Sequence, residues 1–167
     1  MPARRVGVWL IGAKGGVATT MMTGLAALAR RQIEPIGLVT ATAPFEGLDL
    51  ADYSDLVVGG HDIRKGPLAA EAHRMWAESR AIVPELLDAA NSFFAETEAR
   101  LRPGTVVGSG DRIKALADDS AAVIVETPRE AVARAQADIE AFARAEKLDR
   151  VVVVNVASTE PPPDRPI

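Results

Sequence analysis

Short apolar runs alternate with longer segments of helical periodicity along this chain. Val6–Ile11 and residues 151–154 are nearly continuous apolar runs of strand length, as expected for strands covered on both faces. Between them, the apolar residues of positions 19–31 recur at helical spacing. This alternation predicts an α/β fold with a parallel sheet and right-handed crossover connections.

Five further elements are predicted from local signals. They are strands over residues 36–40 and 121–126, and helices over residues 67–80, 84–101 and 128–147. Pro67 and Pro84 stand where the first helical residue is expected. Thr127, Pro128 and Glu130 form a capping-box pattern with proline at the first helical position. Residues 41–60 are rich in turn formers and receive no assignment.

Ligands of such sheets bind at the carboxyl ends of the strands. In the predicted sheet these ends are Gly12, Thr40, Glu126 and Asn155. We expect residues 1–158 to form one Rossmann-like, doubly wound domain. Residues 159–167 contain four prolines and are predicted to leave the fold.

Composition narrows the possible functions. The chain has 167 residues, a net charge of −4 and no block of basic residues, which argues against a nucleic-acid partner. It has no cysteine, which excludes disulfides, thiolate nucleophiles and zinc sites built on cysteine. No apolar run approaches the roughly 20 residues of a membrane span. We therefore expect a cytoplasmic protein without a membrane partner, and no metal-ligating pattern is apparent.

The glycine cluster after the first strand is the strongest candidate site. Backbone N–H groups at the start of a helix lack intrahelical partners, and the helix dipole favours anions there. The predicted phosphate-binding residues are Gly12, Ala13, Lys14, Gly15, Gly16 and Val17. The spacing departs from G-x-G-x-x-G, because the second glycine is displaced to position 15 and Ala18 takes the last position. A tight corner alone could also require these glycines.

An ATPase loop is the rival interpretation of this cluster. In partition-type ATPases, K-G-G-V is followed by G-K-T-T, whereas here Val17 is followed directly by Ala18 and two threonines. The lysine that would reach the β- and γ-phosphates is missing. The sequence therefore favours a dinucleotide over a nucleoside triphosphate.

A dinucleotide site also needs an acidic residue for the ribose hydroxyls, usually at the end of the second strand. Thr40 occupies that position in the predicted sheet, so the acid must come from elsewhere. Asp62, which follows Gly59 and Gly60, is the candidate. The alternative is that these glycines form an ordinary loop and that Asp62 caps a local turn. Arg64 lies two residues after Asp62 and could in principle contact the 2′-phosphate of NADP, although the neighbouring acid disfavours a 2′-phosphate.

Four segments in register resemble one family. They are residues 12–20 (GAKGGVATT), 45–47 (FEG), 59–63 (GGHDI) and 151–160 (VVVVNVASTE). Together they resemble the N-terminal, NAD-binding portion of myo-inositol-1-phosphate synthase, in its archaeal and bacterial branch. The eukaryotic branch has asparagines in the glycine turn and tryptophan where His61 stands. His61 thus occupies an aromatic position of the family, near the adenine, although a structural role is the favoured reading.

The resemblance implies tightly bound NAD and the conversion of D-glucose 6-phosphate to 1L-myo-inositol 1-phosphate by oxidation, aldol cyclisation and reduction. It implies that the glycine turn cradles the pyrophosphate and that Asp62 holds the adenosine ribose. It also places Val156, Ala157, Ser158 and Thr159 beside the cofactor. We expect Asp62→Ala to weaken NAD binding at least tenfold while the fold stays intact.

The resemblance also implies that the family's catalytic lysines and aspartates lie in a later domain. That domain carries much of the tetramer contact, and the chain then returns to complete the sheet. We therefore assign no catalytic residue here and expect an incomplete sheet, self-association and no turnover by these residues alone. A free-standing NAD-binding or sensing module is the alternative, since it would carry the same residues.

Overall fold

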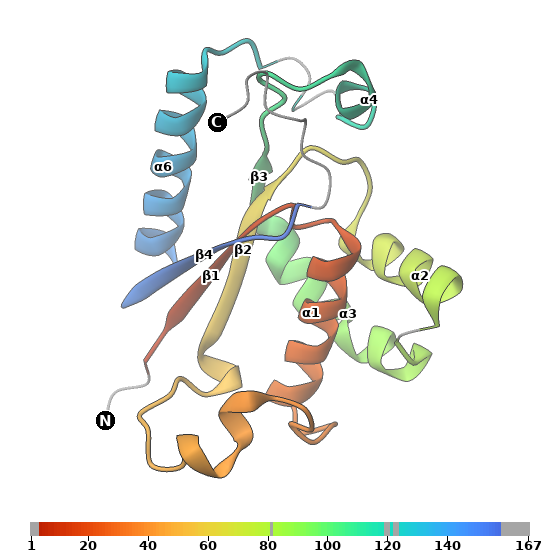
Figure 1. The fold of residues 1–167 in the computed structure, drawn as a ribbon, viewed down its shortest axis with the longest axis vertical. Helices are drawn as coiled ribbons and strands as arrows, with labels where there is room; N and C mark the ends of the chain where they lie inside the picture. Colours follow the sequence, from red (N-terminus) through yellow and green to blue (C-terminus); the bar gives the residue numbers. More distant parts are fainter. Residues whose placement is uncertain (1–3, 81, 119–120, 122–123, 158–167) are drawn as a thin grey trace.

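The computed structural model describes residues 4–80, 82–118, 121 and 124–157 (Figure 1). Within this part of the chain, four parallel strands form one sheet in the order β3-β2-β1-β4. The strands are β1 (Val6–Ile11), β2 (Leu56–Asp62), β3 (Leu101–Pro103) and β4 (Arg150–Asn155). Since this is the order of the first four strands of a doubly wound dinucleotide fold, the predicted Rossmann-like class is confirmed.

Helices cover both faces of the sheet. The helices are α1 (Gly16–Ala29), α2 (Leu68–Ser79), α3 (Pro84–Ala99), α4 (Asp111–Lys114) and α6 (Pro128–Ala145). In Figure 1, α1, α2 and α3 lie on one side of the sheet, α6 lies on the other, and α4 lies beyond the carboxyl ends of the strands. Right-handed crossovers explain this division, because the chain steps outward from β1 to β3 and then returns past β1 to β4.

The main core lies between the sheet and helices α1 to α3. Leu10 and Val58 point from adjacent strands into this layer, where they meet Met22, Leu87 and Phe94, all of them buried. The opposite layer is narrower. There, Trp9 packs on Phe142 of α6 with 5.0 Å between ring centroids.

The second strand lies later in the chain than predicted, so the assignment of residues 36–40 as a strand is wrong. Gly37 has a φ of +82°, and Val39–Ala41 forms a single 3-10 turn whose side chains are exposed. The apolar residues of this stretch lie on the surface instead of crossing the sheet. The true second strand is β2, which lies within and just after the segment that received no assignment.

Gly59 and Gly60 lie inside β2 and not in a loop. A Cβ on Gly59 would lie 3.0 Å from the Trp9 ring, and a Cβ on Gly60 would collide with the carbonyl oxygen of Leu10 on the neighbouring strand. Glycine in a strand often marks such a close approach. The pair therefore reflects packing of β2 against β1 and α6.

The predicted strand over residues 121–126 is also wrong for the part that the structure describes. Ala121 and residues 124–126 lie outside the sheet, and Val125 is 99% exposed; residues 122–123 lie outside the described residues. The third strand is the short β3, which ends at Pro103, directly before Gly104. An apolar run thus marks a strand only where other elements cover it.

The four predicted helices exist, with shifted ends. Helix α1 begins three residues early, at Gly16, so the glycine cluster itself starts the helix. Pro67 is the N-cap of α2 and not its first residue, whereas Pro84 does open α3. Helix α6 ends at Ala145, shortly before Lys147 adopts a φ of +53°.

The capping box at the start of α6 is confirmed. The hydroxyl of Thr127 accepts from the backbone N–H of Glu130, whose carboxylate accepts from the backbone N–H of Thr127 at 2.8 Å. These bonds satisfy two N–H groups that would otherwise lack partners.

We expect Thr127→Ala to lower the free energy of unfolding by about 1 kcal/mol, because the N-cap acceptor is lost. Urea titration of the variant and the wild type measures this difference. Thr127→Ser, which keeps the hydroxyl, serves as the control and should remain close to the wild type; equal stability of Thr127→Ala would show that the box contributes nothing.

The strand β4 forms an edge of the sheet among the described residues. It pairs with β1, and Val152, Val153 and Val154 are 46%, 52% and 37% exposed. Apolar side chains on both faces of a strand are typical of an inner strand of a parallel sheet.

No helix in the described part of the chain is long and apolar enough to span a bilayer.

Candidate functional site

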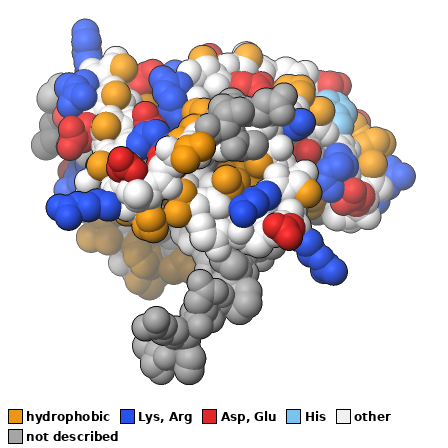
Figure 2. Space-filling model, turned by 90° about the horizontal axis from the view of Figure 1, so that it is seen from above, with side chains coloured by type: hydrophobic (Ala, Val, Ile, Leu, Met, Phe, Trp, Pro, Cys, Tyr) orange, Lys and Arg blue, Asp and Glu red, His pale blue; other side chains and the backbone are white. Residues whose placement is uncertain are grey.

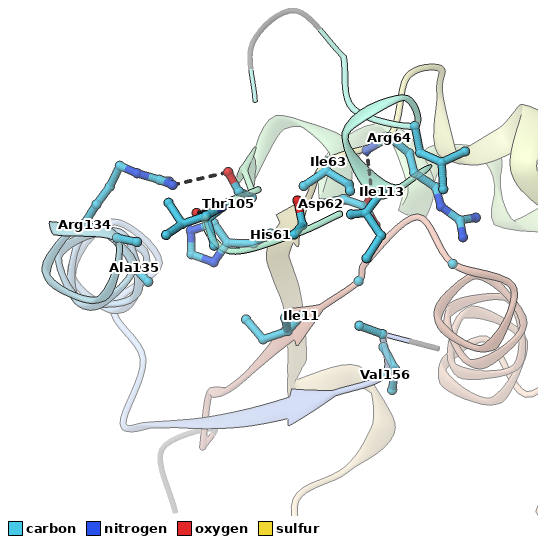
Figure 3. A pocket seen from close by; sticks show the side chains of 18 residues that line it. Ile11, His61, Asp62, Ile63, Arg64, Thr105, Ile113, Arg134, Ala135 and Val156 are labelled. Carbon is cyan, nitrogen blue, oxygen red and sulfur yellow. Dashed lines mark hydrogen bonds between the residues drawn. The ribbon is translucent and has the colours of Figure 1, made fainter. Parts of the chain in front are cut away.

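A cavity of about 280 Å³ opens at the carboxyl ends of the strands (Figure 3). Its walls come from the glycine turn after β1, the end of β2, the loop after β3, α4, α6 and the residues after β4. It therefore lies where the strand order reverses around β1, the position at which doubly wound folds bind their ligands.

The glycine turn is fixed by backbone hydrogen bonds from the end of β2. The carbonyl of His61 accepts from the N–H groups of Gly12 and Ala13 at 2.9 and 3.1 Å. Gly12 has a φ of +89°, and a Cβ there would lie 2.9 Å from the Cα of Ala157. The turn thus needs glycine both for its backbone angle and for its contact with the segment after β4.

Asp62 is the last residue of β2 and holds the turn from the other side. Its Oδ2 accepts from the backbone N–H of Lys14 at 2.6 Å, and its Oδ1 accepts from the backbone N–H of Arg64 at 2.7 Å. Each carboxylate oxygen can accept a further hydrogen bond. Because β2 is the second strand, the acid stands at the usual position of a dinucleotide fold, and the absence of an acid at Thr40 has no bearing on the site.

Lys14 does not extend toward the cavity. Its Nζ donates to the carbonyl of Gly66 at 2.8 Å and lies 3.8 Å from a carboxylate oxygen of Glu98. Although the sequence places Lys14 among the candidate phosphate-binding residues, its side chain is therefore directed away from that site. Its backbone N–H instead serves as an anchor for Asp62.

The structure brings together only some of the predicted cofactor residues. Those that line the cavity are Gly12, Gly15, Asp62, Val156 and Ala157. Ala13 is fully buried behind the turn, while Gly16 and Val17 belong to the first turn of α1. Ser158 and Thr159 lie outside the described residues.

His61 is buried beneath the cavity and is hydrogen-bonded on both ring nitrogens. Trp9 Nε1 lies 3.0 Å from Nδ1, and Asp138 Oδ2 lies 2.9 Å from Nε2. Since the indole N–H can only donate, Nδ1 must be the acceptor, and Nε2 carries the proton that is donated to Asp138. A neutral imidazole satisfies both contacts, which supports the structural role favoured from sequence.

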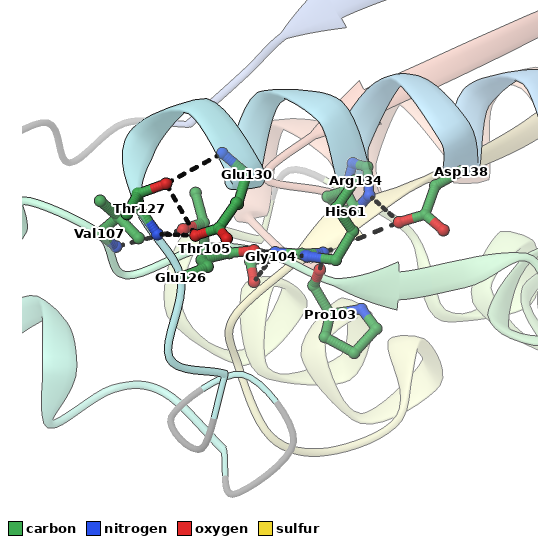
Figure 4. Close-up of polar contacts among 10 residues, drawn as sticks. All are labelled: His61, Pro103, Gly104, Thr105, Val107, Glu126, Thr127, Glu130, Arg134 and Asp138. Atoms are coloured by element: carbon green, nitrogen blue, oxygen red, sulfur yellow. Dashed lines mark hydrogen bonds and ion pairs between the residues drawn. The ribbon is translucent and has the colours of Figure 1, made fainter.

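Arg134 of α6 ties this helix to the loop after β3 (Figure 4). Its guanidinium forms a two-point contact with Glu126 at 2.9 and 2.7 Å and donates to the carbonyls of Pro103 and Gly104 at 2.7 and 3.2 Å. It also lies 3.8 Å from Asp138. The hydrogen bonds from Arg134 hold the pKa of Glu126 below its ordinary value.

We expect Arg134→Met to lower the free energy of unfolding by about 2 kcal/mol near neutral pH, because the Glu126 carboxylate and two carbonyls lose a charged donor. A carboxylate with a lowered folded-state pKa stabilises the fold above its unfolded-state pKa and stops doing so as the pH falls through the folded-state value. The difference from the wild type should therefore shrink in acid.

Urea unfolding of both proteins at neutral pH and at about pH 3 checks this expectation. Arg129→Met, at an exposed position in the same helix, is the matched control and should have little effect. A loss of stability that is the same at both pH values would contradict the assigned ion pair.

Sequence reasoning missed the α6 side of the site, although a signal existed. Ala131, Arg134, Ala135 and Asp138 follow one another at helical spacing and therefore share one face of α6. Of these, Ala131, Arg134 and Ala135 line the cavity. Two small residues beside two charged ones on a single face could have marked it as facing a ligand site.

Other kinds of site find no support in the described residues. They contain no group of three or more histidine, aspartate or glutamate side chains placed to hold a metal ion. Seen from above, as in Figure 2, acidic and basic side chains are intermixed and no continuous patch of either sign covers this face.

Comparison with known proteins agrees with this geometry. A family model for the NAD-binding domain of myo-inositol-1-phosphate synthase matches residues 6–165. The chain is 33% identical over 167 residues to inositol-3-phosphate synthase 1 of Bacteroides thetaiotaomicron, covering 93% of this chain and 37% of the relative.

Two solved structures share the fold. Inositol-3-phosphate synthase of Caenorhabditis elegans superposes with a TM-score of 0.69 at 19% identity, covering 93% of this chain and 34% of that one. A myo-inositol-1-phosphate synthase-related protein of Thermotoga maritima gives a TM-score of 0.52 at 21% identity, covering 94% and 35%. The chain thus spans about a third of the length of the relatives it matches, and it belongs to the myo-inositol-1-phosphate synthase family, where it corresponds to the NAD-binding domain.

Proposed function

We propose that the cavity at the strand ends binds the adenosine end of NAD, and that the full-length protein converts D-glucose 6-phosphate to 1L-myo-inositol 1-phosphate. The observation that carries the binding proposal is the position of Asp62. It joins the glycine turn to the end of the second strand and keeps acceptor capacity on both oxygens for two ribose hydroxyls.

The remaining walls also suit this ligand. Ile63, Val107 and Ile113 provide an apolar lining for the adenine ring, and the start of α1 offers free backbone N–H groups to the pyrophosphate. The cavity volume of about 280 Å³ falls just below the roughly 300–1,000 Å³ of sites for whole drug-sized ligands. We infer that the described residues enclose only part of the dinucleotide and that later residues enclose the rest.

When bound here, NAD would supply the hydride-transfer chemistry of the reaction. The residues of this domain bind and orient it: the glycine turn holds the pyrophosphate, Asp62 the ribose, and Val156, Ala157, Ser158 and Thr159 flank it. The proposal assigns residues 1–158 to the cofactor domain and residues 159–167 to the exit toward a catalytic domain. A cytoplasmic location and a homo-oligomeric, tetrameric full-length enzyme belong to the same proposal.

Calorimetric titration of the 167-residue chain with NAD, and with NADP and ATP as controls, tests the binding proposal. We expect saturable NAD binding that exceeds the binding of either control, and no turnover of glucose 6-phosphate by this chain alone. Preferential ATP binding would contradict the proposal, and measurable turnover would contradict the assignment of catalysis to another domain.

A further inference from the structure

Arg64 is a half-buried cation on the wall of the cofactor cavity. Its backbone is fixed at two points: the N–H donates to Asp62, and the residue forms an isolated antiparallel bridge with Ala117. Among the described residues, no carboxylate or carbonyl accepts a hydrogen bond from its guanidinium. The side chain is therefore held beside the cavity with its hydrogen-bonding capacity unused.

The Asp62 carboxylate places Arg64 next to the glycine turn. One oxygen of this carboxylate binds the N–H of Arg64 at 2.7 Å and the other binds the N–H of Lys14 at 2.6 Å, so a single group bridges the two segments. Gly15 and Arg64 line the same cavity. In Figure 3 the Arg64 side chain extends toward the helix that follows the turn, which is α1.

The charges around the cavity give this side chain a specific task. Arg134, the other arginine on the wall, forms an ion pair with Glu126. The two hydrogen bonds of the His61 ring are those of a neutral imidazole. Asp62 adds a negative charge. A dinucleotide brings two negative phosphates to this site, and Arg64 is the one cation of the described cavity wall that is free to meet them.

We propose that Arg64 binds the pyrophosphate of the dinucleotide through its guanidinium, opposite the N–H groups at the start of α1. This inference rests on the proposed NAD site and names a side-chain contact that the glycine turn itself does not supply. A 2′-phosphate is the poorer partner, because it would lie against the Asp62 carboxylate. Arginine suits a pyrophosphate because its planar fork can donate to two phosphate oxygens at once.

The test compares Arg64→Gln with the wild type in calorimetric titrations of NAD, ADP-ribose, adenosine and NADP. We expect Arg64→Gln to bind NAD and ADP-ribose about tenfold more weakly, the loss typical of one charge-assisted hydrogen bond. Adenosine affinity should not change, and Arg64→Lys should recover part of the loss at low salt. Arg102→Gln is the matched control, since Arg102 is exposed and donates to the carbonyls of Ala99 and Leu101.

Other results would overturn the inference in recognisable ways. An equal loss for adenosine would mean that Arg64 stacks on the base, and a loss confined to NADP would assign it to a 2′-phosphate. Unchanged NAD affinity in Arg64→Gln, with the wild type binding normally, would overturn this inference alone. A wild-type chain that binds none of the four ligands would overturn the proposed NAD site as well.

Discussion

Asp62→Ala is expected to bind NAD at least tenfold more weakly than the wild type, a loss of about 1.4 kcal/mol of binding free energy. The carboxylate contributes in two ways: it offers acceptors to the ribose hydroxyls and it sets the position of the glycine turn. Removing it leaves the backbone N–H groups of Lys14 and Arg64 without their acceptor.

The same two N–H groups make the variant less stable. A donor without a partner costs about 1–3 kcal/mol when it is fully buried, and these two are partly buried, so we expect Asp62→Ala to keep the fold at a lower free energy of unfolding. Affinity is therefore measured below the onset of unfolding, as judged by circular dichroism. Glu98→Ala, which removes only a 3.8 Å contact to Lys14 Nζ, is the control and should retain NAD affinity; wild-type affinity in Asp62→Ala would remove this residue from the site.

Gly12→Ala is expected to lower the free energy of unfolding by about 3 kcal/mol. A side chain at a φ of +89° costs roughly 1–2 kcal/mol, and a Cβ placed 2.9 Å from the Cα of Ala157 adds the cost of overpacking, about 1–3 kcal/mol. The neighbouring backbone must shift to make room, so the turn should also lose its geometry for a phosphate.

Gly24→Ala provides a matched comparison within the next helix. Gly24 lies in α1, and a Cβ there would meet nothing within 4 Å. This substitution should stabilise the protein by about 0.5–1 kcal/mol, because alanine loses less conformational freedom in a helix than glycine does. Urea titration of both variants checks the pair; similar effects of the two substitutions would show that Gly12 is not under steric constraint.

The glycine turn could be located from sequence because its signals are local. An apolar run of strand length passes directly into glycines and then into helical periodicity, and the structure has β1 followed by α1 at these positions. The same holds for α6, whose capping box involves Thr127 and Glu130 only. Elements defined by neighbouring residues could be predicted to within a few positions.

The second strand could not be found in this way, because its signal is tertiary. Gly59 and Gly60 suggest a loop when only the chain neighbours are considered. Their place in β2 follows from Trp9, Phe142 and Leu10, which lie far away in sequence and leave no room for a Cβ. Conversely, residues 36–40 have strand-like composition, but no element in the described part of the chain pairs with them or covers them.

The polar wall of the site was hidden for a similar reason. Glu126 was expected at a strand end, whereas in the structure it forms an ion pair with Arg134 of α6. Asp138 lies one helical turn after Arg134 on the same face of α6. These contacts depend on how α6 crosses the sheet. Asp62 was nevertheless proposed from sequence as the acid of the site, and the structure places it at the end of β2, a strand that had not been recognised.

A crystal structure of this chain with NAD bound tests the central claim most directly. We expect the pyrophosphate at the N–H groups of the glycine turn, both adenosine ribose hydroxyls within hydrogen-bond distance of Asp62, and the adenine beside Ile63 and Ile113. A dinucleotide bound elsewhere, or one with its nicotinamide end in this cavity, would contradict the account.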